Sequence, residues 1–317
     1  MELPPPIKGI LVQNPRSSAS PRVKRRRLAV VAGIVAIAAV VAGCATEAGS
    51  TKSLGDRPQP SVSAAPEAVS QVSSLEPATG SVTGGTTVSA QGAGLKDATA
   101  VTVGGVPATD VTVKDDTALS FVVPAAVNYQ PTAADIVVLE GDTPIASGVP
   151  FTYAVETGVD AQMAYAMTHW SAYNEAEWGN LNPVGGDCAN FVSQTLIQRG
   201  WEQSDAWHNK GAGAKWTPTW GYVPAMDDWF SSSKGPEVTR LSLEQRDQVK
   251  VGDVAMFDWN KNDTPDHVMI VSKVFAEGDK TVIQLVGHNK DFDYRDLDNT
   301  ITVEHPGGNA WFWSVPV

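Results

Sequence analysis

Cysteine is scarce in this 317-residue sequence, which contains only Cys44 and Cys188. So few cysteines exclude the class of small secreted domains that several disulfides hold together. Histidine and tryptophan are missing from the first half of the chain, because all five histidines and all ten tryptophans lie from His169 onward. Any chemistry that needs an imidazole is therefore confined to the second half.

Basic residues are outnumbered, with 23 Lys and Arg against 35 Asp and Glu and a formal net charge of −12. A surface of this sign repels nucleic acids and anionic lipid headgroups. We therefore expect no nucleic-acid partner, and we expect a monomer.

Long hydrophobic runs are absent except at residues 28–43, which are apolar, uncharged and follow the basic run 24–27. A basic start, an apolar stretch too short for a comfortable membrane span and small residues at its end are typical of a secretory signal. The last residues, Val41-Ala42-Gly43-Cys44, resemble the lipobox of bacterial lipoproteins, which implies lipidation of Cys44 and attachment to the cell membrane from outside. An uncleaved membrane anchor and an ordinary signal peptide remain as alternatives.

Composition divides the chain into four parts. We predict a lipoprotein signal peptide over 1–43, a disordered tether rich in Ser, Ala and Pro over 44–73, a β-sandwich over 74–154 and a catalytic domain over 159–317. If Cys44 is acylated, Cys188 has no partner for a disulfide within the chain. An unpaired thiol in an oxidising compartment is itself a hint of function.

The third part, 74–154, is rich in Val, Thr and Gly, and its short alternating runs are separated by turn residues. This pattern predicts strands over 86–92, 100–105, 108–115, 118–124 and 135–141. The landmarks Leu75–Gly80, Gly84-Gly85-Thr86, Gly92–Leu95 and Val101–Ala108, with Phe151-Thr152-Tyr153 at the end, resemble an IPT/TIG domain, which has an immunoglobulin-like fold. The resemblance implies either a spacer or a binding or adhesion module, and the near absence of aromatics favours the spacer.

The segment GGDCANFVSQ (185–194) places Cys188 at the start of a predicted helix that ends near Gly200. A thiol at a helix N-terminus lies among unpaired backbone N–H groups, which favours the nucleophilic thiolate. A small buried cysteine in a core is the alternative. The preceding residues 159–173 predict another helix, and a short helix is expected near 223–230.

Three alternating segments, 252–260, 267–275 and 281–289, predict an antiparallel meander. His267 opens the second strand, and the third ends at His288-Asn289, so a candidate base and a candidate orienting residue follow the cysteine helix. The intervening run DWNKNDTPDH (258–267) only partly fits a calcium loop, since its sixth position is not Gly and its twelfth is not Glu. We expect no metal and no cofactor.

The motifs Gly185–Gln194, Trp216–Trp220, Gly252-Asp253-Val254, Asp266–Val271 and His288–Asp291 resemble the bacterial “putative amidase domain” family, which looks like a relative of NlpC-type and CHAP cell-wall hydrolases. The resemblance covers about 155 residues. It implies an α+β papain-like cysteine hydrolase domain, so the expected fold is a multi-domain chain in which an all-β immunoglobulin-like sandwich precedes that domain.

The same resemblance implies Cys188 as nucleophile, His267 as base and a third member among His288, Asn289 and Asp291, with His288 the first choice. Asn182, six residues before the cysteine, is a candidate oxyanion donor, and Asp187 is expected to cap the helix. At least half of the set Trp207, Trp216, Trp220 and Trp229 is expected in the core, the rest lining a groove.

These residues predict an enzyme that hydrolyses amide or peptide bonds through a thioester, and its expected location makes peptidoglycan the nearest abundant substrate. Hydrolysis of protein instead of peptidoglycan cannot be separated from this by sequence. The alternative from a different class is a non-catalytic surface lipoprotein that binds a partner through the IPT/TIG-like domain.

Overall fold

The structure, a computed structural model, describes residues 70–316. The predicted signal peptide, Cys44 and the tether up to residue 69 lie outside these residues. Within residues 70–316, no helix is both long and apolar enough to span a membrane.

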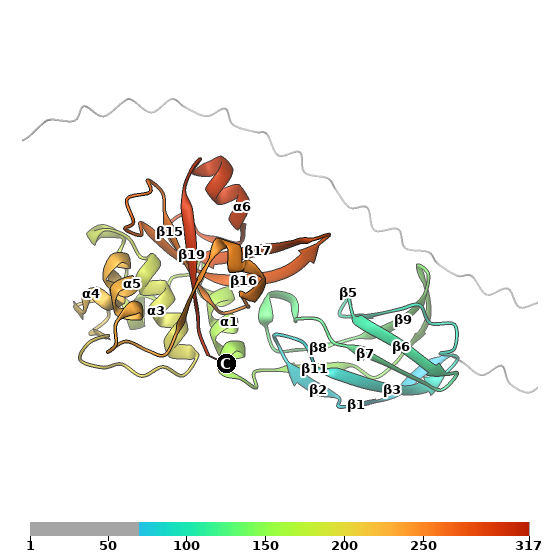
Figure 1. The fold of residues 1–317 in the computed structure, drawn as a ribbon. Coiled ribbons are helices and arrows are strands. Elements are labelled where there is room, and N and C mark those ends of the chain that lie inside the picture. The colour runs from blue at the N-terminus through green and yellow to red at the C-terminus, as the bar shows by residue number, and fades with distance from the viewer. Residues whose placement is uncertain (1–69, 317) are drawn as a thin grey trace, which may run out of the picture. The chain divides into compact units, whose positions relative to one another are not determined.

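The first part of the described chain is all-β (Figure 1). One four-stranded sheet has the order β1-β3-β7-β6, a second has the order β10-β9-β4-β5, and a three-stranded sheet has the order β2-β11-β8. Their bounds are β1 Gln71–Glu76, β2 Thr79–Ser81, β3 Thr87–Ala93, β4 Ala100–Val103, β5 Val106–Pro107, β6 Thr109–Asp115, β7 Ala118–Val122, β8 Thr132–Ala134, β9 Ile136–Glu140, β10 Thr143–Ser147 and β11 Phe151–Ala154, with a short 3-10 turn η1 at Val127–Tyr129.

Alternation builds the core of this region. In β3 and β9 every second side chain is buried, so that Val88, Ala90, Ile136 and Val138 are completely covered. All five predicted strands are present within about a residue or two, which confirms the β-rich character of this region. The first strand begins at Gln71, inside the range predicted for the tether.

The second part mixes helices and strands. Its helices are α1 Gly158–His169, α2 Glu175–Trp178, α3 Cys188–Gln198, α4 Pro218–Gly221, α5 Val223–Ser231 and α6 Leu297–Asn299, with turns η2 Asn182–Val184, η3 Leu243–Gln248 and η4 Thr300–Glu304. A two-stranded ribbon joins β12 (Asn209–Lys210) and β13 (Lys215–Trp216).

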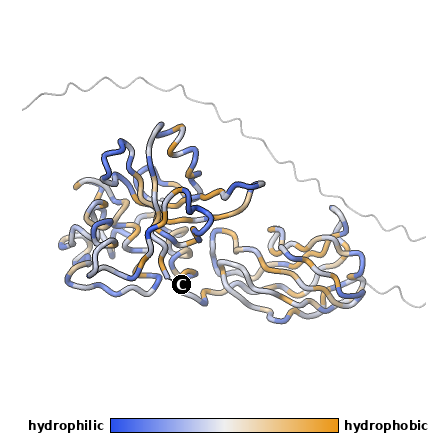
Figure 2. The backbone as a smooth tube through the Cα atoms, viewed as in Figure 1, coloured by the Kyte–Doolittle hydropathy of each residue, from blue (hydrophilic) through white to orange (hydrophobic). Residues whose placement is uncertain are grey.

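A six-stranded antiparallel sheet with the order β14-β19-β15-β16-β17-β18 organises this part. Its strands are β14 Thr239–Ser242, β15 Val254–Asp258, β16 His267–Glu277, β17 Lys280–Gly287, β18 Phe292–Asp296 and β19 Asn309–Ser314. The meander β15-β16-β17 confirms the three predicted strands, and α1, α3 and α5 confirm the three predicted helices. Figure 2 shows hydrophobic residues along the central strands of this sheet.

The two faces of the sheet carry different clusters. Val254, Met256, Val268 and Ile270 belong to the cluster that also contains buried residues of α1, α3 and α5. The alternate residues, Phe257 and Met269 among them, belong to a second cluster that contains Leu297 of α6. Because side chains alternate along a strand, the cysteine helix and α6 lie on opposite faces of the sheet.

Candidate active site

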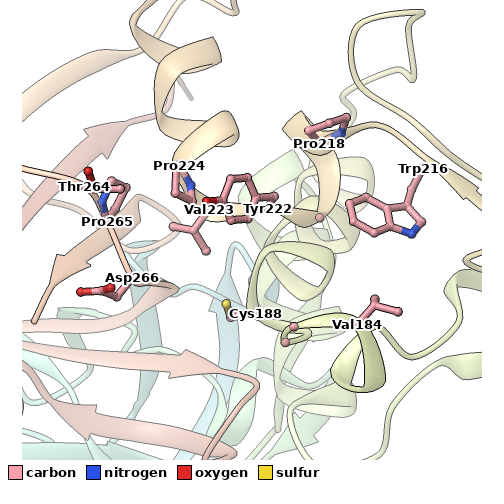
Figure 3. A pocket seen from close by; sticks show the side chains of 13 residues that line it. Val184, Cys188, Trp216, Pro218, Tyr222, Val223, Pro224, Thr264, Pro265 and Asp266 are labelled. Carbon is pink, nitrogen blue, oxygen red and sulfur yellow. The ribbon is translucent and has the colours of Figure 1, made fainter. Parts of the chain in front are cut away.

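Cys188 is the first residue of α3, and its side chain lies at the wall of a cavity of about 450 Å³ (Figure 3). Gly185 and Gly186 lead into the helix with φ angles of 135° and 133°, which side chains rarely allow. The glycine pair therefore lets the chain turn sharply, and it leaves the approach to the thiol free of side chains. Cys188 is 7 % exposed.

The opposite walls of this cavity come from two other segments. Trp216, Tyr222 and Val223 come from the region of α4 and α5, and Thr264–Asp266 come from the loop before β16. Figure 3 shows the Cys188 sulfur between these two walls. A mostly apolar cavity of this volume has the size of a small-molecule or peptide site.

Opposing effects act on the pKa of the Cys188 thiol. Burial raises its pKa to about 11, and the nearby Asp187 carboxylate acts in the same direction. The backbone N–H groups of Val268, Ala189 and Cys188 itself lower the pKa, but by less. The expected shift toward thiolate is therefore wrong for the resting site: the helix start supplies N–H groups, but desolvation outweighs them.

Asp187 forms a buried pair with His288. The Asp187 Oδ2 atom lies 2.6 Å from His288 Nδ1, and the two side chains are 0 % and 1 % exposed. The other ring nitrogen, Nε2, lies 2.9 Å from the carbonyl oxygen of His169. A carbonyl only accepts hydrogen bonds, so Nε2 carries a proton, while Nδ1 shares a hydrogen bond with the Asp187 carboxyl group.

Aromatic rings hold the His288 ring in place. The Tyr173 ring stacks on His288 with centroids 3.6 Å apart and planes 4° apart, and Phe191 of α3 lies at 4.1 Å on an inclined plane. With both nitrogens bonded, His288 is a positioning residue that ties the end of β17 to the start of the cysteine helix.

Asp187 does not cap α3 as expected, because its side chain makes no capping bond. Its Oδ1 atom accepts hydrogen bonds from the Leu181 N–H at 2.7 Å and from Asn190 Nδ2 at 2.9 Å. The buried Asn190 in turn accepts from Trp220 Nε1 at 2.7 Å. The sequence did not predict this network, and its one signal was the run of polar residues Asn190, Ser193 and Gln194 on one face of the helix.

Asn289 joins the network from the strand side. Its Oδ1 atom accepts the Asp187 N–H at 2.6 Å, and its Nδ2 atom donates to Asn182 Oδ1 at 2.5 Å. Asn182 Nδ2 faces the Tyr173 hydroxyl at 3.5 Å. The predicted oxyanion donor and one predicted third member therefore contact each other beside the glycine turn. Asp291, the other candidate, accepts from the Tyr173 hydroxyl at 2.8 Å.

His267 lies apart from this group. It pairs across the ladder with Phe257, a member of the α6-side cluster, and its ring is 5.9 Å from that of Trp259. Burial, with Arg295, His305 and Lys290 nearby, lowers its pKa to about 3, so the imidazole is neutral. In the described part of the chain, its Nε2 atom has no hydrogen-bond partner.

The structure therefore brings Asp187, His288 and Asn289 together beside Cys188, but it does not join His267 to them. The expectation that His288 or Asn289 orients His267 is not met, because their hydrogen bonds go to Asp187, His169 and Asn182. The neighbour of His267, Val268, directs its N–H to the thiol. The roles of Cys188 and His267 in catalysis stay predictions.

The predicted tryptophans divide between the core and the cavity wall. Trp207 and Trp220 are buried, whereas Trp216 lines the Cys188 cavity. The Asp258 carboxylate accepts backbone N–H groups of Asn260, Asn262 and Asp263, as a turn residue does. Residues 70–316 contain no group of three His, Cys, Asp or Glu side chains placed to hold a metal ion.

Comparison with protein families agrees with this division of the chain. Residues 157–313 match the family described as “Putative amidase domain”, and residues 70–153 match the IPT/TIG domain. Along the chain, a region similar to an IPT/TIG domain thus precedes a region similar to an amidase domain, and the second similarity suggests a hydrolase. No curated protein matches the chain.

The solved structures that match are similar over a short stretch only. Auxiliary nutrient binding proteins from Bacteroides ovatus ATCC 8483 and Bacteroides thetaiotaomicron VPI-5482 are 23 % and 24 % identical, each with a TM-score of 0.23. The matches cover 28 % of this chain and 22 % of those chains. This chain thus spans about a fifth of their length, and so low a TM-score supports no functional argument.

Proposed function

We propose that this protein is a cysteine hydrolase that cleaves an amide or peptide bond through a thioester on Cys188. One observation carries the proposal: the thiol lies in the wall of a peptide-sized cavity, at a helix start, with three backbone N–H groups around the sulfur. The match of residues 157–313 to an amidase family supports the same chemistry.

In the proposed reaction the Cys188 sulfur attacks the amide carbonyl carbon and loses its proton to a general base. The negative charge that develops on the carbonyl oxygen needs hydrogen-bond donors, and the Cys188 N–H at the free helix start can supply one. Collapse of the tetrahedral intermediate breaks the C–N bond, and the protonated base donates its proton to the leaving amine. Water then hydrolyses the thioester and restores the thiol.

We propose His267 as the base, because it is neutral and has an unpartnered nitrogen, and because the next residue contacts the thiol. His288 cannot serve without losing a hydrogen bond, since both of its nitrogens are occupied. The His267 ring faces the other side of the sheet at the first position of β16. Proton transfer to it therefore requires the side chain to turn toward Cys188 when substrate binds.

We further propose that the enzyme acts outside the cytoplasm, attached to the membrane by a lipid on Cys44, with peptidoglycan stem peptides as its substrate. This part of the proposal rests on the basic and apolar segment 24–43 and on the lipobox-like residues 41–44. The amide bonds of the adjacent cell wall would then be the most abundant substrate within reach.

The test is mass analysis of purified peptidoglycan fragments after incubation with the full chain and with Cys188→Ala. The expected result is new fragments that differ by cleavage of one amide bond, formed by the wild type and reduced at least about a thousandfold by the substitution. Equal cleavage by both proteins would exclude Cys188 as nucleophile. No cleavage by either would favour the surface lipoprotein that binds a partner through its IPT/TIG domain.

A further inference from the structure

A second cavity, of about 330 Å³, lies on the α6 side of the sheet. It is lined by Trp259, His267, Asn289, Lys290, Arg295 and His305. None of these six side chains is acidic, although the chain as a whole has a net charge of −12. A cationic cavity in an acidic protein indicates an anionic ligand.

Acidic residues of the protein neutralise the positive charge of this cavity only in part. Glu304 accepts a hydrogen bond from Arg295 Nη2, and Asp266 accepts one from the Trp259 N–H. Lys290 makes no ion pair in the described part of the chain. Burial lowers the pKa of His305, and so does its proximity to Lys290 and Arg295. These groups thus repel one another in the empty cavity.

Buried nitrogens at this cavity lack partners. Arg295 is 4 % exposed and His267 is 7 % exposed, yet Arg295 Nε and His267 Nε2 have no hydrogen-bond partner among the described residues. A buried donor without a partner is destabilising, so such groups call for a ligand or an ordered water. An acceptor with negative charge satisfies the guanidinium best.

The shape of the cavity favours a planar acceptor. Trp259 stacks on His305 with ring centroids 3.9 Å apart and planes 13° apart, which makes one flat wall. A guanidinium presents donors in a plane that matches the two oxygens of a carboxylate. The volume admits a carboxylate with a few attached atoms.

This cavity adjoins the Cys188 cavity along the start of β16. Asp266 lines the Cys188 cavity and His267 lines the cationic one. Asn289 lines the cationic cavity, and its Oδ1 atom lies 3.3 Å from the position that a Cβ on Gly186 would occupy in the wall of the Cys188 cavity. The two cavities thus lie on either side of the sheet end at which β16 begins, and an extended substrate that enters both must pass around this end.

We propose that the cavity formed by Lys290, Arg295 and His305 binds a free carboxylate of the same substrate whose amide reaches Cys188. This rests on the proposed function, and it names the substrate class as acidic peptides with a carboxylate close to the scissile amide. The bound charge would also offset the cations around His267 and would favour the protonated imidazole that must donate to the leaving amine.

The first test is binding, which needs no activity. The full chain with Cys188→Ala is titrated with N-acetylglycine, with the neutral N-acetylglycinamide and with inorganic phosphate, while the imidazole signals of its five histidines are followed by NMR. The proposal expects saturable shifts of His305 and His267 with N-acetylglycine alone. Lys290→Gln should weaken this binding about fivefold or more, whereas Lys273→Gln, which removes an exposed charge of β16 away from the cavity lining, should not.

Equal shifts with N-acetylglycinamide, stronger binding of phosphate, or no shift at all would overturn the carboxylate site. The second test compares hydrolysis of an acidic peptide with that of its amidated counterpart. Lys290→Gln should lower kcat/KM for the acidic peptide about tenfold and leave the amidated peptide unchanged. Binding without hydrolysis would leave the site standing while the proposed enzyme function fails, and hydrolysis with no preference for the acidic peptide would do the reverse.

Discussion

At the scale of single residues, a balance between burial and backbone hydrogen bonds sets the pKa of the Cys188 thiol. Burial dominates, and it holds the pKa at about 11 in spite of three N–H groups around the sulfur. His267, with a pKa of about 3, is also uncharged. The resting site thus has a neutral thiol and a neutral imidazole, so the thiol must lose its proton as it attacks.

The raised pKa predicts slow alkylation of Cys188 near neutral pH. At pH 8 about one thiol in a thousand is ionised when the pKa is about 11, compared with about a quarter of an exposed cysteine. We expect the rate of modification by iodoacetamide to rise about tenfold for each pH unit between 7 and 10. Peptide mapping measures it at Cys188 separately from Cys44, and a rate independent of pH between 6 and 9 would contradict the raised pKa.

The buried pair of His288 and Asp187 predicts a large effect on stability. His288→Phe keeps a ring between Tyr173 and Phe191 but leaves the buried Asp187 Oδ2 atom without its partner, which should lower the free energy of unfolding by about 3–5 kcal/mol. Urea unfolding measures the change. In the matched variant His208→Phe, the lost ring makes a hydrogen bond to the Ser204 carbonyl, and the free energy of unfolding should fall by less than about 1 kcal/mol.

Similar losses in both variants would contradict the buried pairing of His288 with Asp187.

The sequence alone predicted Cys188 at a helix start, because the glycine pair and the apolar spacing are local signals. It could not predict the pairing of Asp187 with His288, which are 101 residues apart, or the face on which His267 lies. The face of His267 depends on the register of β16, because a shift of one residue in a strand moves every side chain to the opposite face.

At the scale of elements, α1 shows how the start of the amidase-type domain is held. Thr157 accepts the Asp160 N–H, while Asp160 accepts the N–H groups of Glu156 and Thr157 and so completes a capping box. Asp160 also accepts from Ser81 and Thr83. Burial alone would raise the pKa of Asp160, but these hydrogen bonds together lower it.

Asp160→Asn should therefore lower the free energy of unfolding by about 1–3 kcal/mol near pH 7, since several charge-assisted bonds weaken. A carboxyl whose pKa is lowered by folding contributes stability above its ordinary value of 3.8, and this contribution is lost as the pH falls through the lower folded value. Urea unfolding at pH 7 and at pH 3 should thus show a smaller difference between variant and wild type at the lower pH.

A difference that stays constant with pH would contradict the role of the carboxylate charge. The control is Asp142→Asn in an exposed turn, which should change stability by less than about 0.5 kcal/mol.

The meander β15-β16-β17 could be predicted because its strands alternate and follow one another closely. The pairing of β19 between β14 and β15 could not, because these partners lie far apart in sequence.

At the scale of the whole molecule, acidic residues predominate while cationic groups gather at one cavity beside the cysteine site. The composition predicted the acidic surface but not the cavity, since Lys290, Arg295 and His305 come from separate segments that only the folded sheet brings together. The order of the two domains was readable from composition, because tryptophan and histidine occur only in the second.

The most direct test of the central claim is the mass of the Cys188 peptide during turnover. Wild-type protein is mixed with a cleavable acidic peptide, quenched in acid within the first turnovers and mapped by mass spectrometry. The account predicts an acyl group on Cys188 that hydroxylamine removes, as a thioester requires. Release of product with no acyl group on Cys188, at a rate that Cys188→Ala retains, would contradict it.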